Sequence, residues 1–253
     1  MTTAENGRSR VVLITGAAGA LGTAVARRLG SEGATDLVLC DLSAERLDEA
    51  AALVKDTGAS VVTRVVDVTD PSAVEDAVAG AVDRFGRLDV MINNAGVLSA
   101  NGRIHNLPPE EWNKQLQVTF MGTVHGTTSA VRVMRKQDGG GSIINTASVS
   151  GMTAWPYAAP YGAAKAAVIQ LTKVAAVEYA TERVRVNCVC PGTFESAMSA
   201  DIPDAALPVV ASKHPLGLGT PDELVGAYSY LAGPDSRWTT GSAMVVDGGY
   251  SAR

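Results

Sequence analysis

The chain has 253 residues, of which 46% are hydrophobic and 19% are charged, and its formal net charge is −5. With 26 glycines that follow no period and only three cysteines, the composition excludes collagen-like, disordered and disulfide-scaffold proteins. The negative charge without a long Lys/Arg run, and the lack of an apolar stretch of about 18 residues, argue against nucleic-acid and membrane partners.

Short β-branched runs alternate with longer Ala-rich segments of helical periodicity along the chain. The polar start, MTTAENGRSR, lacks the apolar middle of a signal peptide, so we expect a cytoplasmic protein. Strands are predicted at Val11–Ile14, Leu37–Cys40, Val61–Val66, Val90–Ile92, Ser142–Asn145, Val184–Val189 and Ala243–Val246. Helices are predicted near residues 21–31, 43–57, 71–85, 109–136, 160–181 and 221–232, with two starts at Asp41–Ser43 and Asp70-Pro71.

Strand–helix alternation through the whole length predicts a single doubly wound α/β domain over residues 1–253. The strands are almost continuously apolar, which is typical of a parallel sheet covered by helices on both faces. We therefore expect a Rossmann-type, seven-stranded parallel sheet. Residues 192–217 break the rhythm, and we expect a substrate lid there; the alternative is a surface excursion without a role.

The first strand runs directly into a glycine-rich turn, Thr15-Gly16-Ala17-Ala18-Gly19-Ala20-Leu21-Gly22. Such a turn lets the backbone approach a pyrophosphate, which the amino end of the next helix then binds. The alternative is that the glycines serve tight strand-to-helix packing. Asp41 follows the second strand, where a ribose-binding carboxylate is expected, and no Arg or Lys lies in this turn. The pattern favours NAD(H) over NADP(H), although Asp41 could also be a plain helix cap.

Further motifs follow in a fixed order along the chain: Asn93-Asn94-Ala95-Gly96, Ser148, Tyr161-Gly-Ala-Ala-Lys165, Cys190-Pro191-Gly192 and Asp247-Gly248-Gly249. Ser148 lies thirteen residues before Tyr161. Together with the glycine turn, these motifs resemble the compact, single-domain subgroup of short-chain dehydrogenases/reductases. The resemblance covers nearly the whole chain.

Tyr161 and Lys165 are four residues apart on a predicted helix, so both side chains project from one face. A phenol titrates near pH 10, and a neighbouring ammonium with the oxidised nicotinamide would bring the pKa of Tyr161 towards working pH. The resemblance implies that Tyr161 is the general acid/base, that Ser148 orients the substrate oxygen, and that Lys165 also holds the nicotinamide ribose.

The resemblance also implies a set of cofactor contacts. The expected NAD contacts are Gly16, Gly19, Ala20, Leu21, Gly22, Asp41, Leu42, Asp67, Val68, Asn94, Ala95, Gly96, Tyr161, Lys165, Pro191, Gly192, Phe194 and Ser196. Each has a structural alternative, such as Asp67 as a cap, Asn94 as a turn former or Gly192 as a flexible backbone position. They converge on one ligand, which favours the functional interpretation.

The expected substrate contacts are Ser148, Met152, Trp155, Tyr157, Phe194 and Met198. Core filling is an equally good interpretation of Met152 and Trp155, and plain packing remains an alternative for Tyr157, which has no Lys four residues on. With Ala197, Ile202 and Leu207 in the lid, these side chains are mostly apolar. We therefore expect a small hydrophobic or cyclic alcohol or ketone.

Two positions depart from the family pattern. The compact subgroup usually has Gly where this chain has Ala20, and the spacing TGxxGxxG is that of a longer, extended subgroup. Only about sixty residues follow Pro191, too few for the extra substrate domain of that subgroup. Thr119 stands where the family usually has an Asn that carries a water of the proton relay. A Thr hydroxyl can hold a water or bond a helix carbonyl, so we expect Thr119 to belong to an altered relay.

Cys40, Cys188 and Cys190 lie in apolar runs without a CxxC pair, and the histidines lack metal-binding spacings, so no metal site is predicted. The leading hypothesis is an NAD(H)-dependent oxidoreductase that interconverts a secondary alcohol and a ketone. The alternatives are a 3-oxoacyl thioester reductase, which would need a basic patch that Arg103, Lys114 and Lys213 do not obviously form, and a catalytically weak nucleotide-binding protein. The resemblance further implies a homotetramer.

Overall fold

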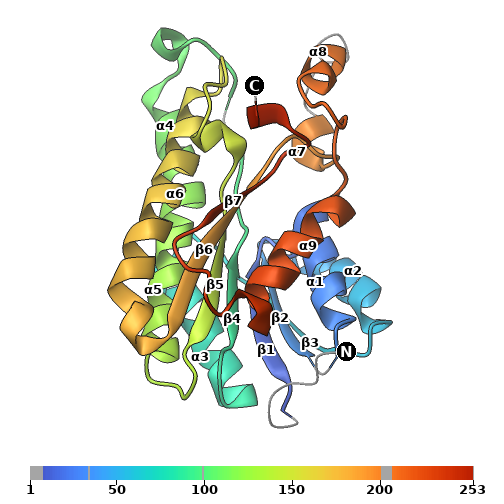
Figure 1. The fold of residues 1–253 in the computed structure, drawn as a ribbon, viewed down its shortest axis with the longest axis vertical. Coiled ribbons are helices and arrows are strands. Elements are labelled where there is room, and N and C mark those ends of the chain that lie inside the picture. The colour runs from blue at the N-terminus through green and yellow to red at the C-terminus, as the bar shows by residue number, and fades with distance from the viewer. Residues whose placement is uncertain (1–7, 34, 99, 201–206, 253) are drawn as a thin grey trace.

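Seven parallel strands form one sheet in the computed structural model, which describes residues 8–33, 35–98, 100–200 and 207–252 (Figure 1). The strands are β1 (Arg10–Thr15), β2 (Thr35–Asp41), β3 (Ser60–Val65), β4 (Val90–Asn93), β5 (Gly141–Thr146), β6 (Val184–Pro191) and β7 (Ala243–Val246). Their order is β3-β2-β1-β4-β5-β6-β7, and every neighbouring pair is parallel. Each predicted strand overlaps one of these, so the predicted Rossmann-type fold is confirmed.

Helices cover both faces of the sheet, which explains why the strands are apolar on both sides (Figure 1). Successive residues of a strand point to opposite faces. Val12 accordingly packs with the helices of one layer, and its neighbour Val11 packs with those of the other. The first layer contains α1 (Ala20–Gly30), α2 (Ala44–Lys55) and α9 (Pro221–Ala232), and the second contains α3 (Pro71–Phe85), α5 (Gly122–Met134) and α6 (Ala159–Tyr179).

Two predicted helix starts are confirmed by their caps. Ser43 precedes α2 and its hydroxyl accepts a hydrogen bond from the N–H of Arg46. Asp70 precedes α3 and its carboxylate accepts from the N–H of Ser72, while Pro71 occupies the first helical position. These local signals fix where α2 and α3 begin, so the loops after β2 and β3 are short.

The single helix predicted near residues 109–136 is in fact three consecutive segments. They are α4 (Pro109–Gln115), a π-helical segment (Leu116–Met121) and α5. A hydrophobic pattern with a period of 3.6 residues cannot reveal a single π turn. Such a turn changes the backbone hydrogen bonds to i→i+5 but requires no particular residue types. The difference matters because Thr119 lies inside the π-helical segment.

The segment predicted as a lid follows β6 and contains no strand among its described residues. It includes α7 (Ala197–Ala200) and α8 (Leu207–Ser212), which lie beyond the carboxyl ends of the strands (Figure 1). Ile202, one of the predicted lid residues, lies outside the described residues. The two ends of the segment are held together, because the N–H of Glu195 donates to the carbonyl of Gly219 at 3.0 Å.

Candidate active site

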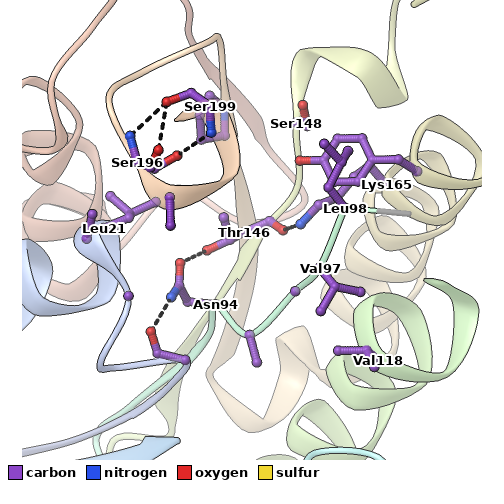
Figure 2. A pocket seen from close by; sticks show the side chains of 18 of the residues that line it. Leu21, Asn94, Val97, Leu98, Val118, Thr146, Ser148, Lys165, Ser196 and Ser199 are labelled. Carbon is purple, nitrogen blue, oxygen red and sulfur yellow. Dashed lines mark hydrogen bonds between the residues drawn. The ribbon is translucent and has the colours of Figure 1, made fainter. Parts of the chain in front are cut away.

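The carboxyl ends of the strands surround a cavity of about 940 Å³, at the upper end of the range of about 300–1,000 Å³ that is usual for ligand pockets. The turns after β1, β2, β4, β5 and β6 all contribute to its wall. Figure 2 looks into this cavity, with Asn94, Thr146 and Lys165 at its centre. Because parallel strands end on the same edge of a sheet, residues far apart in sequence meet here.

The glycine turn needs its glycines for two different reasons. Gly16 has φ +64°, and a Cβ there would lie 2.8 Å from Cα of Ala95. A Cβ on Gly22 would lie within 2.3 Å of the Gly16 carbonyl oxygen, so α1 could not pack on the turn. Among the described residues no side chain caps the amino end of α1, and Ala20 and Leu21 of its first turn line the cavity. The uncapped N–H groups and the helix dipole make this end of the cavity suitable for a pyrophosphate.

Asp41 ends β2 beside the glycine turn. One of its carboxylate oxygens accepts from the N–H of Ala18 at 3.0 Å, and the other accepts from the N–H of Leu42 at 2.8 Å. Arg46, in the first turn of α2, donates to the carbonyl of Ala18 at 3.0 Å and also lines the cavity. Sequence inspection of the turn missed this cation, because it reaches back from the following helix. This end of the cavity, where a ribose is expected, therefore carries both a carboxylate and a guanidinium.

The third and fourth strands supply the next part of the wall. The carboxylate of Asp67 accepts from the N–H and the hydroxyl of Thr69, which forms a tight turn after β3. Val68 is buried beside it. Asn94 follows β4 and its side-chain amide donates to the carbonyl of Gly16 at 3.0 Å. The fourth strand end is thereby tied to the glycine turn.

Ser148, Tyr161 and Lys165 lie together on the opposite wall. Ser148 follows β5, and its hydroxyl accepts from the N–H and the hydroxyl of Ser150 at 3.2 and 3.0 Å. Tyr161 and Lys165 come from the first two turns of α6. A Cβ on Gly151 would lie 2.7 Å from the carbonyl carbon of Lys165, so this glycine lets the Ser148 turn pack directly on the helix. The spacing predicted from sequence does bring the three side chains to one cavity.

Burial dominates the protonation of Tyr161 and Lys165. It raises the pKa of Tyr161 above its ordinary value, and a hydrogen bond with Ser148 partly opposes the shift. Burial also lowers the pKa of Lys165 to about 8, although the thiols of Cys190 and Cys188 oppose this. Lys165 Nζ donates to the carbonyl of Thr146 at 2.6 Å and lies 5.6 Å from the centre of the Tyr161 ring. In this arrangement burial dominates the pKa of Tyr161, whereas the lowering expected from sequence also counts on the positive charge of the oxidised nicotinamide.

Thr119 lies behind this wall and does not line the cavity. Its hydroxyl oxygen accepts from the side-chain amide of Gln115 at 2.7 Å and from the N–H of Val97 at 3.4 Å. A Cβ placed on Gly96 would be 3.6 Å from both Thr119 Oγ1 and Lys165 Nζ. Because Gly96 has no side chain, both polar groups can lie close to its backbone. Sequence inspection did not identify Gln115, a fully buried side chain one helical turn before Thr119.

The sixth strand leads into the last part of the site. Pro191, Gly192, Phe194 and Ser196 all line the cavity. A Cβ on Gly192 would lie 2.8 Å from Cα of Asp247, so the glycine is required by the close approach of the next strand. Ser196 Oγ accepts from the N–H of Ser199 at 3.2 Å, at the start of α7.

The expected substrate wall is only partly formed as predicted. Trp155 and Tyr157 line the cavity, and Tyr157 has φ 69°, a strained conformation for a bulky residue. Its carbonyl accepts from the N–H of Gly102 at 2.9 Å, which holds this conformation. Met152 does not line the cavity, because the 3₁₀ turn before it ends there and leaves the side chain half exposed. The side chain of Met198 lies outside the described part of the structure.

Most of the predicted residues share this one cavity. Its lining includes Gly16, Gly19, Ala20, Leu21, Gly22, Asp41, Leu42, Asp67, Val68, Asn94, Ala95, Gly96, Ser148, Trp155, Tyr157, Tyr161, Lys165, Pro191, Gly192, Phe194 and Ser196. Thr146 and Lys114 also line it and were missed, since Thr146 belongs to no motif and Lys114 carries no local signal of its position. Arg103 lines a neighbouring hollow that shares Trp155 and Tyr157 with the cavity.

The arrangement fits the dinucleotide expected from sequence. Gly16, Gly19 and Gly22 leave the backbone of the turn bare where a pyrophosphate would lie, and Asp41 lines the end where a ribose would lie. Figure 2 shows Ser148 and Lys165 across the cavity from Leu21, and Tyr161 comes one helical turn before Lys165 on α6. The cavity is therefore able to hold an extended ligand between a helix amino end and a Ser–Tyr–Lys cluster.

Comparisons with known proteins agree with this arrangement. A family model described as Enoyl-(Acyl carrier protein) reductase matches residues 16–251. The chain is 38% identical to 2-(R)-hydroxypropyl-CoM dehydrogenase of Xanthobacter autotrophicus, over 96% of this chain and 99% of that protein. It is 36% identical to 3-oxoacyl-[acyl-carrier-protein] reductase FabG of Thermotoga maritima, over 95% of this chain and 97% of that protein.

Among solved structures, carveol dehydrogenase from Mycobacterium avium in complex with NAD superposes with a TM-score of 0.92. The two sequences are 31% identical, and the superposition covers 97% of this chain and 99% of that one. The sequence similarity and the structural similarity both extend over nearly the whole chain. The chain belongs to the short-chain dehydrogenase/reductase family.

Proposed function

We propose that the protein is an NAD(H)-dependent oxidoreductase that interconverts a secondary alcohol and a ketone. The observation that carries the proposal is the convergence of Ser148, Tyr161 and Lys165 on the cavity that also contains the glycine turn. A binding protein without catalysis would not need these three side chains on the same wall. They are the groups that proton transfer at a carbinol oxygen requires.

The bound nicotinamide would supply the hydride acceptor for oxidation and the hydride donor for reduction. Tyr161 would take the proton from the substrate hydroxyl, or return it to the carbonyl oxygen, from within a buried site that excludes water. Ser148 would hydrogen-bond the same oxygen and orient it. Lys165 would hold the nicotinamide ribose and supply the positive charge that favours the phenolate of Tyr161.

Thr119 would belong to the route by which the proton leaves Lys165, although it does not touch the cavity. Thr119 Oγ1 and Lys165 Nζ both lie close to Gly96, which supports this role. A Thr119→Val variant with unchanged turnover would remove Thr119 from the relay.

Asp41 supports NAD(H) rather than NADP(H), because its carboxylate would accept hydrogen bonds from ribose hydroxyls and repel a 2′-phosphate. Arg46 is the group that could favour the phosphate, but its guanidinium donates to the carbonyl of Ala18. NAD(H) therefore remains our proposed cofactor.

The substrate is proposed to be a small hydrophobic or cyclic alcohol or ketone. Trp155, Tyr157 and Phe194 give the outer cavity a mostly apolar wall. Carveol dehydrogenase, a structural neighbour, acts by its name on such an alcohol. The second candidate is a 3-oxoacyl thioester, which is favoured by the similarity to FabG and by Lys114 at the cavity.

We further propose that residues 1–253 act as one catalytic domain, with residues 192–217 as the substrate lid and four copies forming a homotetramer. The position of α7 over the carboxyl ends of the strands supports the lid. The three cysteines are free and buried, which suits a reducing compartment and supports a cytoplasmic location. No helix among the described residues has the length and hydropathy needed to cross a bilayer.

The test is NADH consumption by the purified protein across a panel of cyclic and acyclic ketones and a 3-oxoacyl thioester, with Tyr161→Phe as the matched variant. We expect turnover of at least one ketone and a loss of about 10²-fold or more in the variant. NADH binding, followed by fluorescence, is measured on both proteins. Unaltered turnover in Tyr161→Phe would contradict the mechanism, and a protein that does not bind NADH would contradict the proposed cofactor.

A further inference from the structure

A second buried tyrosine lies beneath the site and takes no part in the chemistry proposed above. Tyr228 belongs to α9, on the side of the sheet away from Tyr161, and its side chain is fully buried. Its phenol oxygen lies 2.9 Å from the hydroxyl oxygen of Thr146, the last residue of β5. A phenylalanine would fill the same apolar space, so the hydroxyl needs its own explanation.

The hydrogen bonds fix the direction in which the protons are donated. The single hydroxyl proton of Thr146 goes to the side-chain carbonyl of Asn94 at 3.3 Å. Tyr228 must therefore be the donor to Thr146. The side-chain amide of Asn94 in turn donates to the carbonyl of Gly16 at 3.0 Å. A chain of three hydrogen bonds, all pointing the same way, runs from α9 to the first glycine of the turn (Figure 2 draws its last two bonds).

Thr146 also connects this chain to the catalytic wall. While its side chain links Tyr228 to Asn94, its main-chain carbonyl accepts from Lys165 Nζ at 2.6 Å. Figure 2 shows Thr146 between Asn94 and Lys165. Any shift of Thr146 would move the anchor of the glycine turn and the anchor of Lys165 together.

Tyr228 is suited to act as a fixed donor. Burial raises its pKa well above the ordinary value for tyrosine, so the group stays a neutral phenol at every pH at which the protein would work. Because the Tyr228 hydroxyl donates to Thr146, the hydroxyl proton of Thr146 is directed towards Asn94. In a buried network, bonds that point the same way strengthen one another.

On the basis of the function proposed above, we propose that Tyr228 is a positioning residue, whose hydroxyl fixes Thr146 and thereby places both the Gly16 turn for the cofactor pyrophosphate and Lys165 for the nicotinamide ribose. It touches neither ligand nor reacting atoms. Its effect passes entirely through Thr146.

The test compares Tyr228→Phe with Tyr230→Phe in the full-length protein. Tyr230 is on the same helix and its hydroxyl also lies 2.8 Å from a threonine hydroxyl, Thr239, but at the surface. We expect the Kd for NADH, measured by fluorescence titration, to rise about three- to tenfold in Tyr228→Phe, the effect of losing one buried hydrogen bond. We expect kcat to fall as well, because Thr146, whose main-chain carbonyl anchors Lys165, is no longer held in place. Tyr230→Phe should change neither quantity by more than about twofold.

Variants of Thr146 test whether the effect passes through that residue. Thr146→Ser keeps the hydroxyl and should retain the wild-type Kd, whereas Thr146→Val should reproduce the defect of Tyr228→Phe. The double variant Tyr228→Phe/Thr146→Val should be no worse than the single Thr146→Val, since both remove the same chain.

Three outcomes would overturn the inference: an unchanged Kd and kcat in Tyr228→Phe with only a lowered Tm, a Thr146→Ser variant as defective as Thr146→Val, or additive effects in the double variant. In each of these the wild-type protein binds NADH and turns over a ketone, so the proposed function stands. A wild-type protein that fails to bind NADH would instead reject the proposed function and this inference with it.

Discussion

Lys165 is a charged side chain that the fold has taken out of water. Burial lowers its pKa from 10.5 to about 8, which means that the folded state disfavours the ammonium. The charge therefore destabilises the protein below pH 8, and this penalty is relieved as the pH rises from about 8 towards 10.5. Under the proposed function, this destabilising group is kept because the chemistry needs a cation there.

Lys165→Met should remove both the destabilisation caused by the buried ammonium and the enzymatic activity. We expect the Tm at pH 7 to rise by about 2–6 °C, with the gain shrinking between pH 8 and 10.5. Differential scanning fluorimetry across this pH range measures the change. Lys173→Met, an exposed position on the same helix, is the matched control and should leave the Tm almost unaltered. A lower Tm in Lys165→Met would show that the bond to Thr146 outweighs the burial of the charge.

The pair of Asp41 and Arg46 should govern the choice of dinucleotide. Asp41→Ser removes the carboxylate that repels a 2′-phosphate and leaves the guanidinium of Arg46 at the same end of the cavity. We expect the ratio of kcat/KM for NADPH over NADH to rise about tenfold or more, a change of roughly 1.4 kcal/mol. Adding Arg46→Ala should abolish this gain. A ratio that does not respond to Asp41→Ser would remove Asp41 from cofactor selection.

At the scale of single elements, local sequence signals predicted most of the structure. The strands are confirmed because buried parallel strands are continuous apolar runs, and α2 and α3 begin at the predicted caps. The π-helical segment at Leu116–Met121 could not be predicted, since it leaves no mark on hydrophobic periodicity. Motif residues predicted most of the cavity wall, whereas Arg46, Thr146 and Tyr228 depend on contacts between distant segments.

Glu32, just after α1, connects α1 with β1 and α9 through hydrogen bonds to its carboxylate. Glu32 accepts from Arg28 at 2.7 Å and from Arg10 at 3.3 Å, and it also accepts from Ser229 of α9. Burial raises the pKa of Glu32, but the bonds from Arg28, Ser229 and Arg10 outweigh it, so the pKa lies below 4.5. Its contribution to stability is therefore present above pH 4.5 and is lost as the pH falls below that value.

Glu32→Gln should lower the Tm at pH 7 by about 2–4 °C, because three partners lose a charged acceptor. The difference from the wild-type protein should shrink as the pH falls below 4.5, where Glu32 itself becomes protonated. Glu75→Gln is the control, since its pair with Arg132 is exposed and 3.2 Å long and should contribute little. A constant difference at all pH values would show that the carboxylate charge is not responsible.

For the whole molecule, the proposed homotetramer requires exposed apolar side chains that can form contacts between copies of the chain. Val174 and Val177 are exposed on one face of α6, and Trp238 is fully exposed before the edge strand β7. Apolar side chains in these positions are suited to contact a second copy of the chain.

Light scattering after gel filtration should give the mass of four chains for the wild-type protein. Val177→Asp should reduce this mass, because a carboxylate would be buried without a partner in the interface. Leu53→Asp, on α2 in the opposite helical layer, should leave the mass unchanged. A monomeric wild-type protein would reject the tetramer.

The π-helical segment makes the surroundings of Lys165 sensitive to the insertion or deletion of a single residue. A π turn accommodates one residue more than an α-helical turn with the same ends. Loss of a single residue between Leu116 and Met121 would therefore let the helix run on regularly, with α4 and α5 in place and the side chains inside the segment shifted by one position. A different side chain would then stand close to Gly96 and Lys165. Evolution can therefore exchange the polar neighbour of Lys165 by inserting or deleting one codon, while the core of α5 stays as it is.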